Sequence, residues 1–249
     1  MSTRPLFLIT GGNRGLGRTM AEHLARGGAD ILITTRGDAS EALAAIAAEG
    51  AEVCALTLDV AEAETFPAFA ETLRATLSEM GRDTLTGVIH NAGIGLYAPL
   101  AETPVETFDT LYRIHLRGPA MLTQALLPQI ADGGRILFIS TGLARFSLPG
   151  YGAYASMKGA VEVMTRYWAR ELAERGISVN ALAPGAIETD FGGGRTRDDA
   201  QVNAAVASFT AMGRAGLPDD IGAAAAALLL SDGNWVTGQR IEASGGMFL

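Results

Sequence analysis

The chain has 249 residues, of which 48% are hydrophobic and 18% charged, and its formal net charge at pH 7 is −8. This acidic balance argues against a nucleic-acid-binding protein, which needs a basic surface for phosphates. A chain of this length can bury one large core, so we expect residues 1–249 to form a single domain without a metal or a disulfide. The longest apolar stretch is far below the roughly 20 residues of a membrane span, and the single cysteine, Cys54, is interpreted as a buried thiol. We expect a cytoplasmic protein that binds no membrane.

Short apolar runs alternate with longer stretches of helical spacing along the chain. The apolar runs predict buried strands at residues 6–10, 31–35, 53–58, 88–90, 135–140, 177–182 and 239–243. The helical stretches predict helices at residues 16–26, 39–49, 65–80, 105–130, 154–175 and 218–231. Strands that are apolar along their whole length are typical of a parallel sheet covered on both faces. We therefore expect an α/β fold in three layers, with a doubly wound parallel sheet (Rossmann fold) of about seven strands.

One segment, at about residues 188–216, interrupts this alternation. It contains three consecutive glycines at 192–194 and then a short apolar helical pattern that ends at Met212. Loops of this length inside compact domains are usually lids or simply mobile. We expect this segment to be a lid over the substrate.

A glycine-rich loop follows the first predicted strand directly. Its sequence is Thr10-Gly11-Gly12-Asn13-Arg14-Gly15-Leu16-Gly17, and a helix begins at once. Glycines at 11, 15 and 17 allow a tight turn, a close approach of the backbone to a pyrophosphate, and close packing of helix on strand. Free N–H groups and the positive end of the helix dipole then hold the phosphates. The placement of this loop predicts a dinucleotide site.

The residue after the second strand indicates which dinucleotide is preferred. NAD sites carry an acid there for the ribose 2′-hydroxyl, and NADP sites carry a basic residue for the 2′-phosphate. Here the strand is followed by Arg36, and the first acid is Asp38. Arg14 is placed to reach the same phosphate, and two arginines can grip it through forked bonds. We expect NADP(H) to be preferred over NAD(H); the alternative is that both side chains are solvent-exposed arginines without a ligand.

Two further strand ends carry residues suited to a nucleotide. Asp59 and Val60 follow the third strand, where the carboxylate is placed to bond the adenine amine. Asn91, Ala92 and Gly93 form a small-residue turn after the fourth strand. Each is an ordinary turn by itself. As a series at the carboxyl ends of strands, where open α/β sheets bind ligands, they support the nucleotide site.

The only lysine of the chain stands in a pattern that suits proton transfer. Eighteen of the nineteen basic residues are arginines, and Lys158 follows Tyr154 by one helical turn, so the two share a helix face. An adjacent ammonium favours the anion of a phenol, whose pKa in water is about 10. The pair can therefore donate a proton to a bound molecule, or accept one from it, closer to neutral pH. Thr141 adds a hydroxyl at the end of the fifth strand; the alternative is a surface Tyr–Lys pair without a function.

Other chemistries have less support. No Gly-x-Ser-x-Gly turn opens a helix, as a serine hydrolase of the α/β type requires. The three histidines, His23, His90 and His115, lack the spacing of metal ligands.

The motifs together resemble those of the short-chain dehydrogenase/reductases, in their single-domain branch, and are similar to β-ketoacyl carrier-protein reductase-like members. The resemblance spans nearly the whole chain. It rests on the glycine spacing of residues 11–17, Asp59-Val60, Asn91-Ala92-Gly93, Thr141, Tyr154-x-x-x-Lys158, Asn180, Pro184-Gly185 and Thr189. The similarity to the carrier-protein reductase-like members rests on a C-terminal signature: Gly213-Arg214, Thr237-Gly238 and Gly245-Gly246.

The resemblance implies a carbonyl–alcohol oxidoreductase. NADPH would deliver hydride to a carbonyl carbon while Tyr154 protonates the developing alkoxide. Lys158 would lower the pKa of the tyrosine and bind the nicotinamide ribose, and Thr141, where the family usually has serine, would hold the carbonyl oxygen. The residues that would fix the nicotinamide follow the sixth strand: Pro184, Gly185, Ile187 and Thr189.

His115 departs from the family, which has an asparagine at this position of the long helix at 105–130. In relatives that asparagine supports a water that relays protons to the lysine. An imidazole also forms hydrogen bonds, and it titrates near neutral pH. We expect His115 to preserve the relay with an altered pH dependence; the alternative is a weakened relay.

The substrate is a small-molecule carbonyl or alcohol that the motifs do not identify. The candidate pocket residues are mostly apolar, which suits a hydrophobic ketone but is equally compatible with a core: Tyr97, Thr141, Phe146, Tyr151, Phe191 and Met212. Arg145 fits an anion contact or, more simply, a solvent-exposed position. Relatives commonly assemble through the fourth and fifth helices and the last strand, so we expect a homotetramer, with a dimer as the alternative.

Two other functions stay open. A cofactor-binding regulatory or scaffold protein of the same fold, with weak turnover, is suggested by His115, although the intact set of Thr141, Tyr154 and Lys158 argues against it. An epimerase or dehydratase of the longer family branch is disfavoured by the glycine spacing.

Overall fold

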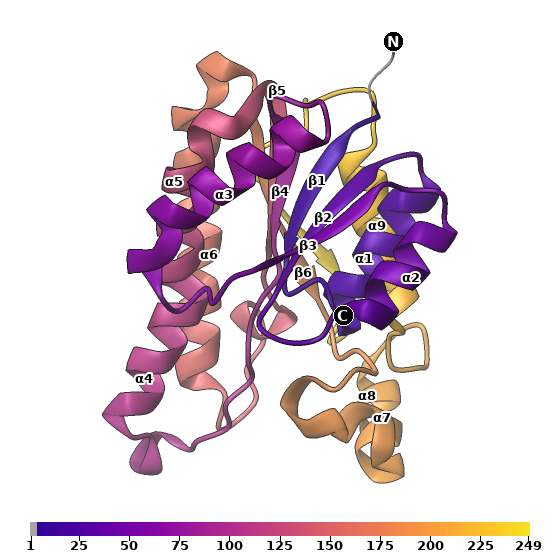
Figure 1. The fold of residues 1–249 in the computed structure, drawn as a ribbon. Helices are drawn as coiled ribbons and strands as arrows, with labels where there is room; N and C mark the ends of the chain where they lie inside the picture. The colour runs from indigo at the N-terminus through magenta and orange to yellow at the C-terminus, as the bar shows by residue number, and fades with distance from the viewer. Residues whose placement is uncertain (1–3) are drawn as a thin grey trace.

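Seven parallel strands form one sheet in the order β3-β2-β1-β4-β5-β6-β7, in a computed structural model that describes residues 4–249 (Figure 1). The order and the parallel pairing confirm the predicted doubly wound sheet. The strands are β1 (Leu6–Thr10), β2 (Asp30–Thr35), β3 (Val53–Thr57), β4 (Leu85–His90), β5 (Ile130–Ile139), β6 (Ser178–Pro184) and β7 (Arg240–Ala243).

Helices cover both faces of this sheet, which makes the three layers that the sequence predicts (Figure 1). One face carries α1 (Gly15–Arg26), α2 (Ser40–Ala48) and α9 (Pro218–Leu229). The other carries α3 (Phe66–Glu79), α5 (Gly118–Leu126) and α6 (Gly152–Glu171), with α4 (Val105–Tyr112) beside α6.

The continuous apolar runs of the strands follow from this double cover. Side chains alternate between the two faces of a strand, so Leu6 and Leu8 of β1 join the core under α3, α5 and α6. Phe7 and Ile9 join the core under α1, α2 and α9. All four are essentially inaccessible to solvent, so neither face of the strand tolerates polar residues.

The predicted helix at 105–130 is interrupted. Between α4 and α5 the chain forms a π-helical turn, Arg113–Arg117, which contains His115. Pro119 follows and has no N–H to donate to the carbonyl of residue 115, so the helix widens there. Gly118 also packs tightly, because a Cβ at this position would lie 2.2 Å from the carbonyl oxygen of Val60.

Two other expectations differ in detail. The segment at 188–216 holds two helices, α7 (Arg195–Asp198) and α8 (Ala200–Phe209), beyond the carboxyl ends of the strands (Figure 1). Cys54 is partly exposed rather than buried, because β3 is an edge strand of the sheet.

Among residues 4–249, no helix is long and apolar enough to cross a lipid bilayer.

The strand order reverses between β1 and β4, which are neighbours in the sheet. Connections leave these two strands toward opposite sides, and such a switch point opens a crevice at the carboxyl ends of the strands. Thr10, His90, Ile139 and Pro184 end their strands at this edge.

Candidate active site

The glycine loop is built to receive an anion. Gly11 and Gly15 have φ angles of 64° and 52°, in the left-handed region that favours glycine. A Cβ at Gly17 would lie 2.2 Å from the carbonyl oxygen of Gly11, so only glycine fits there. Arg14 is the N-cap residue of α1, but its side chain forms no cap, and the first turn of α1 carries no acid. The free N–H groups and the dipole of this helix therefore point into the crevice.

Asn91 locks this loop against β4. Its side-chain Nδ2 donates to the carbonyl oxygens of Thr10, at 2.9 Å, and Gly11, at 3.1 Å. In return the hydroxyl oxygen of Thr10 accepts from the N–H groups of Asn91 and Ala92, each at 3.0 Å. The side-chain amide of Asn91 is thus used to shape the nucleotide crevice.

The residue that follows β2, Arg36, is exposed and forms an ion pair with Asp59. Arg36 Nη1 donates to Asp59 Oδ2 at 3.1 Å, and the Arg36 side chain is 69% exposed. Burial alone would raise the pKa of Asp59, but bonds from the Ala61 N–H and from Arg36 lower it. Asp38, the nearest acid after β2, accepts from both the N–H and the hydroxyl of Ser40. Arg14 is also exposed.

Tyr154 and Lys158 lie together on the face of α6 that packs against the sheet, and each is only 5% exposed. The ammonium Nζ of Lys158 donates to the carbonyl oxygen of Ile139 at 2.6 Å and lies 5.9 Å from the centre of the Tyr154 ring. Burial lowers the pKa of Lys158 to about 8. Burial also raises the pKa of Tyr154 well above its ordinary value, which the Thr141 hydroxyl opposes. The lowering of the tyrosine pKa that was expected from Lys158 is not found here, because desolvation raises the pKa.

Three consecutive residues at the end of β5 are each held by this face of α6. Lys158 binds the carbonyl of Ile139, and the Ser140 hydroxyl donates to Glu162 Oε1 at 2.6 Å. The Thr141 hydroxyl interacts with Tyr154 and also accepts from the Leu143 N–H at 3.3 Å, which caps the 3₁₀ turn Gly142–Ala144. The sequence prediction misses Glu162, although its position four residues after Lys158 places it on the same helix face.

His115 reaches this cluster from the π-helical turn. Its ring stands edge-on to Tyr154 with centroids 5.2 Å apart, and Nε2 lies 2.8 Å from the carbonyl oxygen of Ile94. Nε2 also lies 3.3 Å from the backbone N–H of Ile94, while Nδ1, which is buried, has no partner among the described residues. Burial, and then the charge of Lys158, lower the pKa of His115 to about 3. The expectation that His115 titrates near neutral pH is therefore wrong, because the ring is desolvated.

Close packing also explains Gly93. A Cβ at that position would lie 2.6 Å from Cε1 of His115, so the turn after β4 accommodates the imidazole only with glycine.

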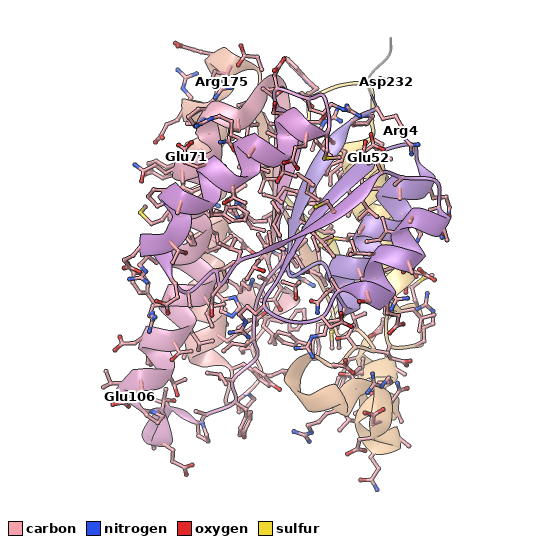
Figure 2. All side chains as sticks on the ribbon, in the orientation of Figure 1. Arg4, Glu52, Glu71, Glu106, Arg175 and Asp232 are labelled. Carbon is pink, nitrogen blue, oxygen red and sulfur yellow. The ribbon has the colours of Figure 1, made fainter. Side chains whose placement is uncertain are left out.

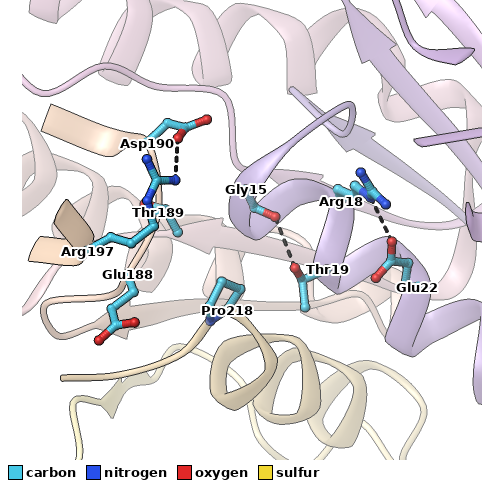
Figure 3. Close-up of a pocket in the computed structure, with 9 residues that line it drawn as sticks. All are labelled: Gly15, Arg18, Thr19, Glu22, Glu188, Thr189, Asp190, Arg197 and Pro218. Atoms are coloured by element: carbon cyan, nitrogen blue, oxygen red, sulfur yellow. Dashed lines mark hydrogen bonds and ion pairs between the residues drawn. The ribbon is translucent and has the colours of Figure 1, made fainter. Parts of the chain in front are cut away.

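A cleft of about 310 Å³ joins the glycine loop to the residues that follow β6 (Figure 3). Arg18 pairs with Glu22 on one wall, and Arg197 pairs with Asp190 on the other. The lining residues are Gly15, Arg18, Thr19, Glu22, Glu188, Thr189, Asp190, Arg197 and Pro218. Gly15 and Thr189, two residues predicted to bind the cofactor that lie far apart in sequence, thus face one cleft.

The segment after β6 is itself well fixed. A Cβ at Gly185 would lie 2.9 Å from Cα of Ser244, and Ile187 forms a parallel bridge with Gly216. Thr189 is buried, and its hydroxyl oxygen accepts from the Phe191 N–H at 3.2 Å. Pro184 is the last residue of β6.

Aromatic side chains surround the Tyr154 cluster. Phe191 has its ring centre 5.7 Å from that of Tyr154, and Tyr97 packs edge-on against Tyr151 at 5.6 Å. Phe146 packs against Phe248 at 4.9 Å. Met212 is 70% exposed and bonds to the C-terminal tail through its backbone N–H, at 3.0 Å from the carbonyl oxygen of Gly245.

Phe248 and its stacked partner Phe209 were not predicted from the sequence. They meet because the C-terminal tail pairs with the end of α8 through an antiparallel bridge between Thr210 and Met247. No local pattern in the sequence signals this pairing.

Comparisons with known proteins identify the family and the fold. A family model described as "Enoyl-(Acyl carrier protein) reductase" matches residues 11–248. Versicolorin reductase 1 of Aspergillus parasiticus is 31% identical over 254 residues, which cover 97% of this chain and 95% of that protein. The solved structure of the promiscuous reductase LugOII, which catalyses keto-reduction at C1 in lugdunomycin biosynthesis, superimposes with a TM-score of 0.93 at 32% identity and covers 99% of both chains. The angucycline C-6 ketoreductase LanV, solved with bound NADP, has a TM-score of 0.91 at 29% identity, over 98% of this chain and 95% of that one.

Proposed function

The chain belongs to the short-chain dehydrogenase/reductase family of oxidoreductases, and we propose that it uses NADP(H) to reduce a ketone or aldehyde to an alcohol, or to catalyse the reverse reaction. The observation that carries the proposal is the buried pair of Tyr154 and Lys158 beside Thr141, at the carboxyl edge of the sheet. Ketoreductases among the structural neighbours support the same reaction class.

The described residues fit a nicotinamide dinucleotide phosphate. The uncapped N-terminus of α1, together with Gly11, Asn13, Gly15 and Leu16, would hold the pyrophosphate. Arg14 and Arg36 would hold the 2′-phosphate, because both are exposed and the nearest acid, Asp38, is already bonded to Ser40. The adenine would lie against Asp59 and Val60, and the nicotinamide against Pro184, Gly185, Ile187 and Thr189. When bound, the cofactor supplies the hydride.

The side chains of the chain itself would manage the proton. The Thr141 hydroxyl donates a hydrogen bond to the carbonyl oxygen of the substrate and orients that oxygen toward Tyr154. Tyr154 gives its phenolic proton to the developing alkoxide. Lys158, protonated at neutral pH and anchored on Ile139, stabilises the phenolate that remains. His115 stays neutral and packs against the tyrosine ring.

The aromatic surroundings favour a hydrophobic substrate. Phe191 lies against Tyr154, and Tyr97, Phe146, Tyr151 and Met212 are proposed to extend the substrate surface; Tyr97 packs against Tyr151 and Phe146 against Phe248. The segment at 188–216 carries Phe191 and Met212, so we assign it as the lid of this site within a single domain. Keto-reduction at C1 by LugOII and the name of LanV, an angucycline C-6 ketoreductase, agree with a ketone substrate.

An enzyme assay tests the proposal. NADPH consumption is followed with a panel of hydrophobic ketones and aldehydes, for the wild type and for Tyr154→Phe, and is repeated with NADH. We expect the wild type to turn over with NADPH and Tyr154→Phe to lose at least about a hundredfold in kcat, while it still binds NADPH. NADPH binding without turnover in the wild type would favour the regulatory or scaffold alternative, and a preference for NADH would remove the roles of Arg14 and Arg36.

A homotetramer is also proposed, with a dimer as the alternative. Large apolar side chains are exposed on α4, on α6 and just before β7, the same elements that the resemblance assigns to subunit contacts: Val105, Phe108, Tyr112, Val163, Tyr167 and Trp235. Light scattering of the purified protein measures the assembly, and a monomer would contradict the proposal.

A further inference from the structure

We propose that Glu162 and Arg240 are positioning residues, which hold Thr141 and the C-terminal tail (residues 244–249) in place for catalysis. The proposal rests on the proposed function, because Thr141 is assigned there to hold the carbonyl oxygen. Neither residue belongs to a motif that the sequence analysis identified.

Glu162 fixes the end of β5 from the helix side. It lies one turn beyond Lys158 on α6, and its Oε1 accepts from the Ser140 hydroxyl at 2.6 Å and from Arg240 Nε at 2.7 Å. The Glu162 side chain is only 12% exposed. A mostly buried carboxylate that accepts from a guanidinium and from a hydroxyl has little freedom to move. The bond to Glu162 therefore fixes Ser140, the residue that precedes Thr141 in the chain.

Arg240 links three elements with one guanidinium. From β7 it donates through Nε to Glu162, through Nη1 to Glu242 Oε2 at 2.8 Å, and through Nη2 to the backbone carbonyl of Thr141 at 3.2 Å. The fork of a guanidinium makes these bonds in fixed directions, which a lysine cannot do. Arg240 therefore sets the position of the Thr141 backbone, from which the hydroxyl projects.

The same network continues to the C-terminal tail. Glu242 accepts two bonds from Arg145, at 2.6 and 2.7 Å, and a third from the Ser244 hydroxyl at 2.6 Å. Arg145 also donates to the backbone carbonyl of Met247 at 2.9 Å. Arg145 is thus part of an ion network, and neither an anion contact nor a free surface arginine is needed to explain it.

The tail in turn builds the aromatic surface around the site. Phe248 follows Met247 and packs between Phe146 and Phe209, each at 4.9 Å. A single network therefore fastens Thr141 on one side and the Phe248 ring on the other.

Charge balance explains why the members depend on each other. Two arginines, Arg145 and Arg240, face two carboxylates, Glu162 and Glu242, and the set is partly buried. Removal of one member leaves an unpaired charge at low solvent exposure, which the rest of the network can relieve only by moving. The movement would be transmitted to the backbone of Thr141.

The experiment compares Arg240→Gln with Arg175→Gln. Arg175 is a matched control, since it also pairs with an acid, Asp132, and binds backbone carbonyls of Leu127 and Ile130. It lies at the opposite end of β5, far from the site (Figure 2). For each variant we measure kcat, KM for NADPH, the melting temperature and amide hydrogen exchange of residues 139–145.

We expect Arg240→Gln to lower kcat at least about tenfold with little change in KM for NADPH, because misplacement of a substrate-orienting group acts on the chemical step. Amide exchange should rise at residues 139–145 and in the tail. Arg175→Gln should lower the melting temperature about as much as Arg240→Gln does, but should change kcat by less than about twofold. Arg240→Lys should recover only part of the loss.

If Arg240→Gln does not fold, the same measurements are made on Glu162→Gln. It keeps an acceptor for Ser140 but loses the charge that faces Arg240, so a smaller fall in kcat is expected. Equal kcat effects of Arg240→Gln and Arg175→Gln, or unchanged exchange at residues 139–145, would overturn the proposal. If the wild type reduces no carbonyl, the proposed function fails by itself, and the exchange measurement still decides whether the network holds Thr141.

Discussion

Replacement of Lys158 by methionine should stabilise the folded protein while it abolishes activity. The ammonium of Lys158 is buried, and its pKa falls from the ordinary 10.5 to about 8 because of desolvation. That fall corresponds to about 3 kcal/mol of folding free energy lost at neutral pH, where the group is still charged. The hydrogen bond to the Ile139 carbonyl, at 2.6 Å, would be lost, and an unpaired buried carbonyl costs about 1–2 kcal/mol. Lys158→Met should therefore gain about 1–2 kcal/mol at pH 7.

The stability contributed by Lys158 changes with pH in the opposite direction to that of a lysine held in a salt bridge. Between pH 8 and 10.5 the folded lysine has lost its proton while the unfolded one keeps it, so the unfolded state binds more protons. Stability of the wild type then rises with pH relative to the variant. From pH 7 to pH 9.5 the advantage of Lys158→Met should shrink by about 2 kcal/mol.

Urea unfolding of both proteins at these two pH values measures the effect, with the difference between them as the quantity compared. Other groups that titrate in this range are common to both proteins and cancel. The reasoning is refuted if Lys158→Met is less stable than the wild type at pH 7, or if the difference does not change with pH. Carbonyl reduction by the variant at a normal rate would contradict the role of Lys158 itself.

Three further substitutions give distinct outcomes. Lys158→Arg should keep the fold but lose most turnover, because a planar guanidinium does not fit the buried space that the compact ammonium occupies beside Tyr154; near-normal NADPH consumption would contradict this. His115→Asn should leave the shape of the pH–rate profile unchanged between pH 5 and 9, because the imidazole, with a pKa of about 3, does not titrate there; a profile that shifts would show that the ring does titrate. Gly17→Ala should cost about 1–3 kcal/mol and weaken NADPH binding, because the new Cβ meets the Gly11 carbonyl oxygen at 2.2 Å. The control Gly159→Ala, inside α6 with open space at its Cβ, should instead gain about 0.5–1 kcal/mol in chemical unfolding.

Much of the fold is encoded locally. The apolar runs of the strands, the glycines of residues 11–17 and the spacing of Tyr154 and Lys158 each depend on neighbours within a few residues, so period and spacing predict them. The seven parallel strands and the three layers follow from that pattern and are confirmed. The proximity of the glycine loop to Thr189 also follows, because parallel strands bring their carboxyl ends to one edge.

The properties of the site depend on contacts between distant residues, which only the tertiary structure decides. The sequence assigns His115 an ordinary imidazole, but its pKa depends on burial against Tyr154 and Ile94. Burial likewise opposes the effect that the lysine was expected to have on the phenol. The sequence determines which groups are present and which strand ends they follow; packing determines their solvation, and Arg240, 99 positions after Thr141, becomes its neighbour only when β7 closes the sheet.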